Sequence, residues 1–134
     1  MAREIETKCI HLEEEENSIN HYGAISYPIY QSATYAHPGV GQSTGYDYSR
    51  LQNPTREHLE KTVASLENGI DALAFSSGMA AITLMMELFK PGDHLIVDAD
   101  LYGGSIRLFN HVSEKNRIEF SSVDCHNENV AAYI

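Results

Sequence analysis

Residues 94–123, HLIVDADLYGGSIRLFNHVSEKNRIEFSSV, carry the pattern that decides the fold class. The apolar run at residues 94–99 predicts a buried strand, and residues 118–123 predict another. Between them, a helix is expected over about residues 104–115. A strand, a helix and a second strand at this spacing indicate a right-handed crossover between parallel strands.

The same alternation starts earlier in the chain. Ile70–Phe75 is a short apolar run that predicts a buried strand, and Met79–Phe89 predicts a helix that is apolar almost all round. Before them, Thr55 is the predicted N-cap of a helix that Gly69 ends. Its apolar residues recur at helical spacing: Leu59, Val63 and Leu66. The predicted class is therefore α/β, with a mostly parallel sheet and helices on both faces.

Residues 1–52 predict an irregular N-terminal arm. Glycine and proline interrupt it repeatedly, but it carries many large side chains that need burial, and another subunit is the expected partner. These side chains are Tyr22, Tyr27, Ile29, Tyr30 and Tyr35. Residues 53–134 are expected to be the first, incomplete part of a large α/β domain. A helix is predicted to begin after Asn127 and reaches Ile134 without a cap, so we expect the front part of a larger protein.

Composition excludes several classes of function. The chain has 134 residues, 43% of them hydrophobic, and a formal net charge of −10, which disfavours binding to nucleic acid or anionic lipid. No apolar run approaches the roughly 18–20 residues of a membrane span, and the N-terminus lacks the pattern of a secretory signal. The two cysteines lie far apart, which suggests a reduced, cytoplasmic protein. The seven histidines are scattered, so no metal site is expected.

Tyr48 and Arg50 form the first candidate site, within the run GYDYSRLQNPT at residues 45–55. An extended backbone would turn both side chains to the same side. A guanidinium fork beside a phenol can clamp a phosphate or a carboxylate. The alternative for the pair taken alone is a packed tyrosine and a surface ion pair.

Two further candidate sites lie where a predicted strand gives way to a helix. At Ser76-Ser77-Gly78-Met79, the free N–H groups of the helix start suit a phosphate, and glycine allows close approach; a plain tight turn is the alternative. At Leu101-Tyr102-Gly103-Gly104, the Tyr102 ring can lie on a flat ligand and its hydroxyl can exchange protons; simple packing is the alternative. Together with the clamp, these motifs describe a planar ring with a phosphate, and pyridoxal 5'-phosphate fits.

In order and spacing the motifs resemble the Cys/Met-metabolism (transsulfuration) family of pyridoxal-phosphate enzymes. The resemblance rests on Tyr48-Ser49-Arg50 with Asn53-Pro54-Thr55, on Ser77-Gly78-Met79 and on Leu101-Tyr102-Gly103-Gly104, and it covers essentially the whole chain. It implies the start of a fold type I large domain. It also implies a function in making or breaking C–S bonds of sulfur amino acids, by elimination from cystathionine-like substrates or replacement on an activated homoserine.

The resemblance also implies roles for single residues. Gly78 and Met79 would give backbone N–H groups to the cofactor phosphate, and Tyr102 would stack on the pyridine ring and act catalytically in proton transfer. Tyr48 and Arg50 would reach the phosphate bound by the neighbouring subunit, in a homotetramer made of two dimers. Gly104 stands where methionine γ-lyases typically have cysteine, which favours the cystathionine enzymes.

Some residues that catalysis requires in that family are not expected among these 134 residues. The chemistry needs a lysine that forms a Schiff base. The lysines of this chain are Lys8, Lys61, Lys90 and Lys115, and none of them stands in the family's Ser-x-Thr-Lys context. The 134-residue chain alone is therefore expected to be inactive. A non-catalytic assembly or regulatory fragment is the alternative hypothesis. A phosphate-binding α/β protein outside the family is a third.

Overall fold

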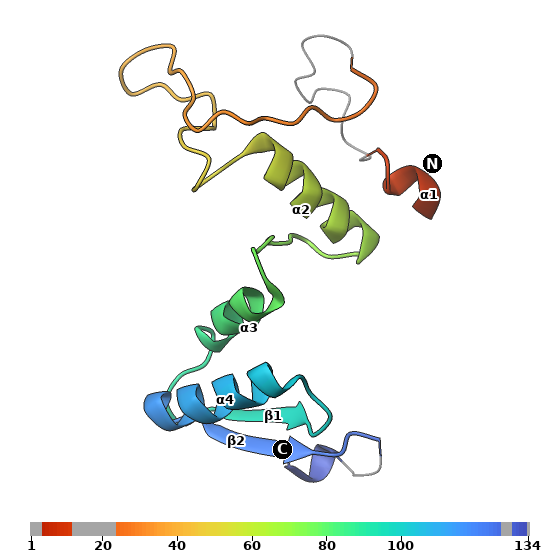
Figure 1. Ribbon diagram of the computed structural model, residues 1–134, viewed down its shortest axis with the longest axis vertical. Helices are drawn as coiled ribbons and strands as arrows, with labels where there is room; N and C mark the ends of the chain where they lie inside the picture. The colour runs from red at the N-terminus through yellow and green to blue at the C-terminus, as the bar shows by residue number, and fades with distance from the viewer. Residues whose placement is uncertain (1–3, 12–23, 127–129, 134) are drawn as a thin grey trace. The chain divides into compact units, whose positions relative to one another are not determined.

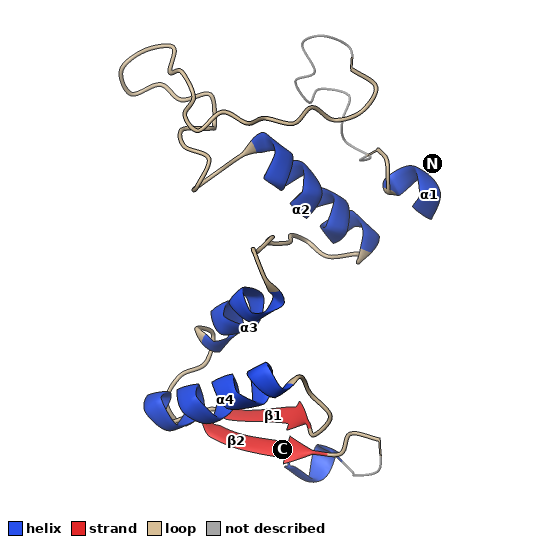
Figure 2. Ribbon diagram, in the orientation of Figure 1, coloured by secondary structure: helices blue, strands red, loops and turns tan. Residues whose placement is uncertain are grey.

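The computed structural model describes residues 4–11, 24–126 and 130–133, and the chain divides into two compact units. Met1–Ala74 is the first unit and Phe75–Ile134 the second. Figures 1 and 2 label the helices and strands of both units. The expected boundary between an arm and a larger domain at residue 52 stays a prediction. No helix in the described part of the chain is long and apolar enough to cross a membrane.

The first unit is built on α2 (Pro54–Leu66), against which the short α1 (Ile5–Lys8) packs. The predicted N-cap Thr55 is wrong, because Asn53 occupies that position and its side chain accepts from the Thr55 N–H. Pro54 then takes the first helical position, where its fixed φ suits a helix and no N–H is needed. The Thr55 hydroxyl is used elsewhere: it accepts from the Tyr30 N–H at 2.8 Å and so fastens the arm to α2.

The end of α2 also differs from the prediction. Asn68, not Gly69, takes the left-handed conformation, with φ of 54°. The Gly69 N–H then reaches back to the Ala64 carbonyl at 2.8 Å, which is the Schellman arrangement of a helix C-terminus. Asparagine tolerates the left-handed conformation better than most residues with a side chain, so the helix can end without glycine at that position, and Gly69 comes one residue later.

Residues 24–52 are irregular, as the sequence predicts, but their tyrosines have partners in their own chain. The Tyr27 ring stacks on His58 of α2 with 3.9 Å between centroids, and the Tyr35 ring lies 5.7 Å from that of Tyr46. Asn53 donates to the Tyr30 carbonyl. These contacts partly meet the need for burial that the sequence assigned to another subunit. Tyr22 lies outside the described residues, and Ile29 is exposed.

The second unit confirms the predicted strand–helix–strand crossover. It contains β1 (His94–Asp98), α4 (Gly103–Asn116) and β2 (Glu119–Val123), and the strands pair in parallel from His94 with Glu119 to Asp98 with Val123. In Figure 2 the helix α4 lies along one face of this sheet. A buried cluster of Met86, Phe109 and Ile118 forms the core, and Phe120 packs its ring 5.9 Å from that of Phe109. A 3₁₀ helix, Val130–Tyr133, stands where a new helix is expected.

Two predictions for the second unit and the segment before it are wrong. Ile70–Phe75 is not a strand: the Ala72 and Ala74 N–H groups donate to the carboxylates of Asp71 and Glu60, and no described strand pairs with the segment. Leu73 is 64% exposed. The helix α3 (Gly78–Met86) forms but ends three residues before the predicted Phe89, and only Met86 of it is buried, because α4 is the main element that it contacts in the described residues.

Candidate functional site

Tyr48 and Arg50 lie side by side, but through a turn and not through an extended segment. Tyr48 forms an isolated antiparallel bridge with Thr34, and its carbonyl then accepts from the Leu51 N–H at 2.9 Å and the Gln52 N–H at 3.0 Å. The predicted extended geometry is therefore wrong at Arg50. The turn nevertheless places the Arg50 guanidinium over the Tyr48 ring, with 5.0 Å from Cζ to the centroid.

Arg50 is exposed, and no carboxylate of the described residues forms an ion pair with it. The simple alternative of a surface ion pair therefore has no support in this part of the chain. A guanidinium stacked on an aromatic ring keeps its N–H donors available at the edge of its plane. The pair is thus equipped to bind an anion.

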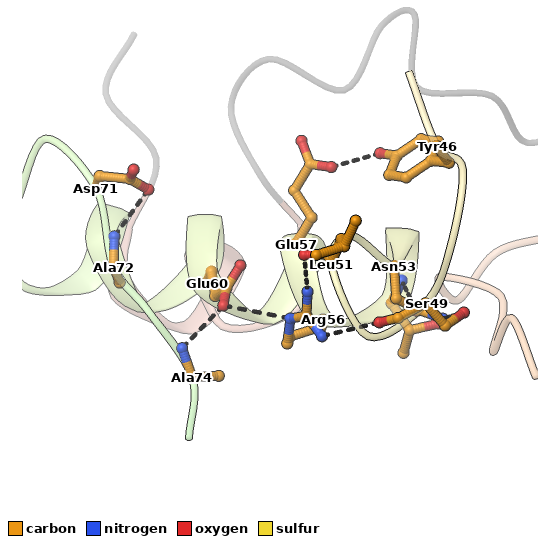
Figure 3. Close-up of polar contacts among 11 residues, drawn as sticks. Tyr46, Ser49, Leu51, Asn53, Arg56, Glu57, Glu60, Asp71, Ala72 and Ala74 are labelled. Atoms are coloured by element: carbon orange, nitrogen blue, oxygen red, sulfur yellow. Dashed lines mark hydrogen bonds and ion pairs between the residues drawn. The ribbon is translucent and has the colours of Figure 1, made fainter. Parts of the chain in front are cut away.

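Hydrogen bonds from α2 hold the backbone of this turn, as Figure 3 shows. The Arg56 guanidinium donates to the Ser49 and Leu51 carbonyls, and the Asn53 amide donates to the Ser49 hydroxyl at 3.0 Å. Nearby, the Tyr46 hydroxyl donates to the Glu57 carboxylate. Arg56 was not predicted from the sequence, and Asn53 was named there only within the Asn53-Pro54-Thr55 motif. The pair Asn53-Pro54 was a usable signal for the cap, whereas nothing in the sequence marked Arg56.

The Tyr46–Glu57 contact shifts both pKa values. Burial, and then the hydrogen bond to the Glu57 carboxylate, raise the pKa of the Tyr46 hydroxyl. Hydrogen bonds from Lys61 and then from Tyr46 lower the pKa of the Glu57 carboxyl. Tyr46 therefore remains a neutral donor and Glu57 a charged acceptor at neutral pH, which keeps this end of the 45–55 run against α2.

The helix α3 starts with two N–H groups that have no acceptor among the described residues. Ser77 is the N-cap, and its hydroxyl accepts from the Ala80 N–H at 3.2 Å. The N–H groups of Gly78 and Met79 precede that bond and are not used by the described chain. A Cβ added to Gly78 would meet nothing within 4 Å, so the backbone is uncrowded beside this residue. A phosphate is a suitable acceptor at this position.

Tyr102 precedes α4 in the same unit and is 71% exposed. Its ring lies against Gly104, since a Cβ on Gly104 would come within 2.5 Å of the Tyr102 Cε1 atom. Any side chain at position 104 would therefore displace the ring. Buried Ser105 donates weakly to the Met79 sulfur at 3.8 Å, which joins the starts of α3 and α4.

These features define a class of protein: an α/β chain whose second unit offers a helix start suited to a phosphate and an exposed tyrosine ring suited to an aromatic ring, and whose first unit offers an arginine suited to an anion. The family model for Cys/Met metabolism PLP-dependent enzymes matches residues 6–134. The chain belongs to this family, whose members depend on pyridoxal phosphate (PLP).

Relatives and solved structures agree with this membership. The chain is 48% identical over 130 residues to a cystathionine γ-synthase/O-acetylhomoserine (thiol)-lyase of Bacillus subtilis, covering 93% of this chain and 34% of that protein. It is 53% identical over 102 residues to a cystathionine γ-lyase of the same organism, covering 76% of this chain and 27% of that protein. The structure of a cystathionine γ-lyase of Lactobacillus plantarum in complex with L-serine matches with a TM-score of 0.82 at 40% identity, covering 98% of this chain and 33% of that chain.

The Xanthomonas oryzae cystathionine γ-synthase in complex with cystathionine matches with a TM-score of 0.81 at 35% identity, covering 92% of this chain and 32% of that chain. The predicted fold class, fold type I with an α/β start, is confirmed by these neighbours. This chain spans about a third of the length of the first relative.

Proposed function

We propose that the whole protein to which this sequence belongs is a PLP-dependent enzyme that makes or breaks C–S bonds of sulfur amino acids. The observation that carries the proposal is the pair of N–H groups at Gly78 and Met79, open to a ligand at the start of α3 in a chain of this family. Relatives named for cystathionine synthesis and cleavage support the substrate class. The alternative of a non-catalytic assembly or regulatory fragment predicts no product.

The residues of this chain fit the cofactor and would hold it as follows. The N–H groups of Gly78 and Met79 would bind the phosphate, and Arg50 with the Tyr48 hydroxyl of a neighbouring subunit would add charge-assisted hydrogen bonds to it. The Tyr102 ring covers the pyridine ring, and Gly104 leaves the space that this ring position requires. When bound, PLP supplies the electron sink for breaking bonds at the substrate carbons.

Tyr102 is the residue of this chain to which we assign proton movement. Its ring is exposed and its hydroxyl is not used by any hydrogen bond within the described residues. A phenol at the edge of the cofactor ring can hold or deliver a proton at its oxygen during elimination. The arrangement thus gives one side chain both a binding and a catalytic role.

Product analysis of the whole protein, supplied with PLP, tests the function. With cystathionine, β-elimination gives pyruvate, ammonia and homocysteine, whereas γ-elimination gives 2-oxobutyrate, ammonia and cysteine. With O-acetylhomoserine and cysteine, replacement gives cystathionine and acetate. We expect at least one of these product sets. A protein that binds PLP and yields none of them would be the non-catalytic alternative.

We further propose that Tyr48 and Arg50 serve the cofactor of a neighbouring subunit in a homotetramer, in the cytoplasm. The large side chains that remain exposed on the arm, such as Ile25 and Ile29, support an intersubunit role for it. The sparse use of cysteine, two in 134 residues, is typical of proteins from a reducing compartment.

Mixing two variants that each bind PLP weakly tests whether two subunits share the site. Neither Arg50→Ala nor Gly78→Pro should bind PLP tightly alone. A mixed dimer should regain one intact site, because Gly78 of one chain meets Arg50 of the other. Bound cofactor per chain, measured by its visible absorbance after co-expression, should therefore rise above that of either variant. Absence of any recovery would mean that both groups act within one chain.

A further inference from the structure

Arg56 makes contacts that none of the roles above uses. Its Nη1 atom donates to the Ser49 carbonyl at 3.1 Å, and its Nη2 atom donates to the Leu51 carbonyl at 2.6 Å. These carbonyls belong to the residues directly before and after Arg50. Figure 3 shows the Arg56 side chain reaching from α2 toward this turn. The Arg56 guanidinium therefore binds the backbone on both sides of Arg50.

Glu60, one helical turn further along α2, orients that guanidinium. Its Oε1 atom lies 3.6 Å from the Arg56 Nε atom, and it also accepts from the Ala74 N–H at 2.8 Å. The Glu60 side chain is 16% exposed and that of Arg56 34%. Partial burial reduces the screening of this ion pair by solvent. Arg56 is thus engaged at all three of its nitrogens by its own chain, which leaves it poorly suited to bind a ligand directly.

The planar fork of arginine is what this geometry requires. Two carbonyls two residues apart are reached at once by two N–H groups in fixed orientation, and a lysine ammonium offers no such fork. Asn53 also holds the turn, through the Ser49 hydroxyl, but it caps α2 as well. Loss of Asn53 would therefore combine two effects, and Arg56 is the cleaner probe.

We propose that Arg56 is a positioning residue, which fixes the Tyr48–Leu51 turn and so holds Arg50 in place for the phosphate. The inference rests on the proposed function, because it takes Arg50 as a phosphate ligand. Ordering a turn costs backbone entropy, and a turn ordered before binding does not lose that entropy when the ligand arrives. Arg56 would therefore act on cofactor affinity without touching the cofactor.

The test measures the affinity of the whole protein for PLP and for pyridoxal, which lacks the phosphate. We expect Arg56→Gln to weaken PLP binding on the order of tenfold, about the cost of ordering the backbone of one more residue on binding, and to leave pyridoxal binding unchanged. Arg56→Lys, which keeps the charge and the aliphatic stem, should not restore PLP affinity. Hydrogen exchange at the Leu51 and Gln52 amides should be faster in both variants. Glu67→Gln, an exposed change at the C-cap of the same helix, is the matched control and should alter none of these values.

Three results would overturn the inference. If Arg56→Gln leaves PLP affinity unchanged while Arg50→Ala weakens it, Arg56 has no positioning role, and the proposed function stays intact. An equal loss of PLP and pyridoxal binding would show a general structural effect instead of a positioned phosphate ligand. If Arg50→Ala itself left PLP affinity unchanged, the proposed phosphate clamp would fail together with the inference.

Discussion

Replacing Gly78 with proline is expected to weaken PLP binding by about 10- to 100-fold, the loss of one hydrogen bond to a charged group, while α3 stays folded. Gly78 is the first residue of α3, where proline is readily accepted. Ser77 before it is extended, with φ of −158° and ψ of 156°, which is the conformation that a following proline favours. The substitution therefore removes one N–H donor and little else.

Gly78→Ala is the control for this experiment, since it adds a Cβ but keeps the N–H. That Cβ has no neighbour within 4 Å, so the fold should accept it. We expect its PLP affinity, measured by titration of the cofactor's visible absorbance, to stay closer to that of the parent than to that of the proline variant. Equal losses in the two variants would show that crowding, not a missing donor, is responsible.

Phe109→Ala is expected to lower the free energy of unfolding by about 3–5 kcal/mol, the usual effect of removing a buried aromatic ring. Phe109 is 8% exposed on α4, and its cluster with Met86 and Ile118 is the core of the second unit. Its ring also packs on Phe120 of β2, so the truncation leaves a cavity between the helix and the sheet.

Urea unfolding followed by far-UV circular dichroism measures this loss. His111→Ala, an exposed change on the same helix, should stay within about 0.5 kcal/mol of the parent. A comparable loss in both variants would contradict the assignment of Phe109 to the core. A small loss in both would mean that this cluster contributes little to the stability of the protein.

Local patterns predicted the second unit well. The residues from His94 to Val123 alternate between an apolar strand, an amphipathic helix and another strand, and the crossover formed as expected. The helices α3 and α4 start at Gly78 and Gly103, each one residue before the predicted start, because a serine cap before Gly78 and the glycine pair after Tyr102 are local signals.

Features that depend on hydrogen bonds between side chains and backbone were not predictable in this way. Ile70–Phe75 has the composition of a buried strand, yet its N–H groups at Ala72 and Ala74 donate to side-chain carboxylates. Likewise, Arg50 sits in a turn because Arg56 and Asn53 hold its neighbours, and these bonds follow from no periodicity. The family resemblance identified the candidate ligand, whereas only the structure shows what supports the turn.

The preference of the whole protein for PLP over pyridoxal tests the central claim most directly, because the two molecules differ only in the phosphate. Gly78, Met79, Tyr48 and Arg50 are all assigned to that group. Dissociation constants from equilibrium dialysis should show PLP bound at least about 100-fold more tightly, as several hydrogen bonds to a charged group imply. Pyridoxal bound as tightly as PLP would contradict the account, since these residues would then hold no phosphate.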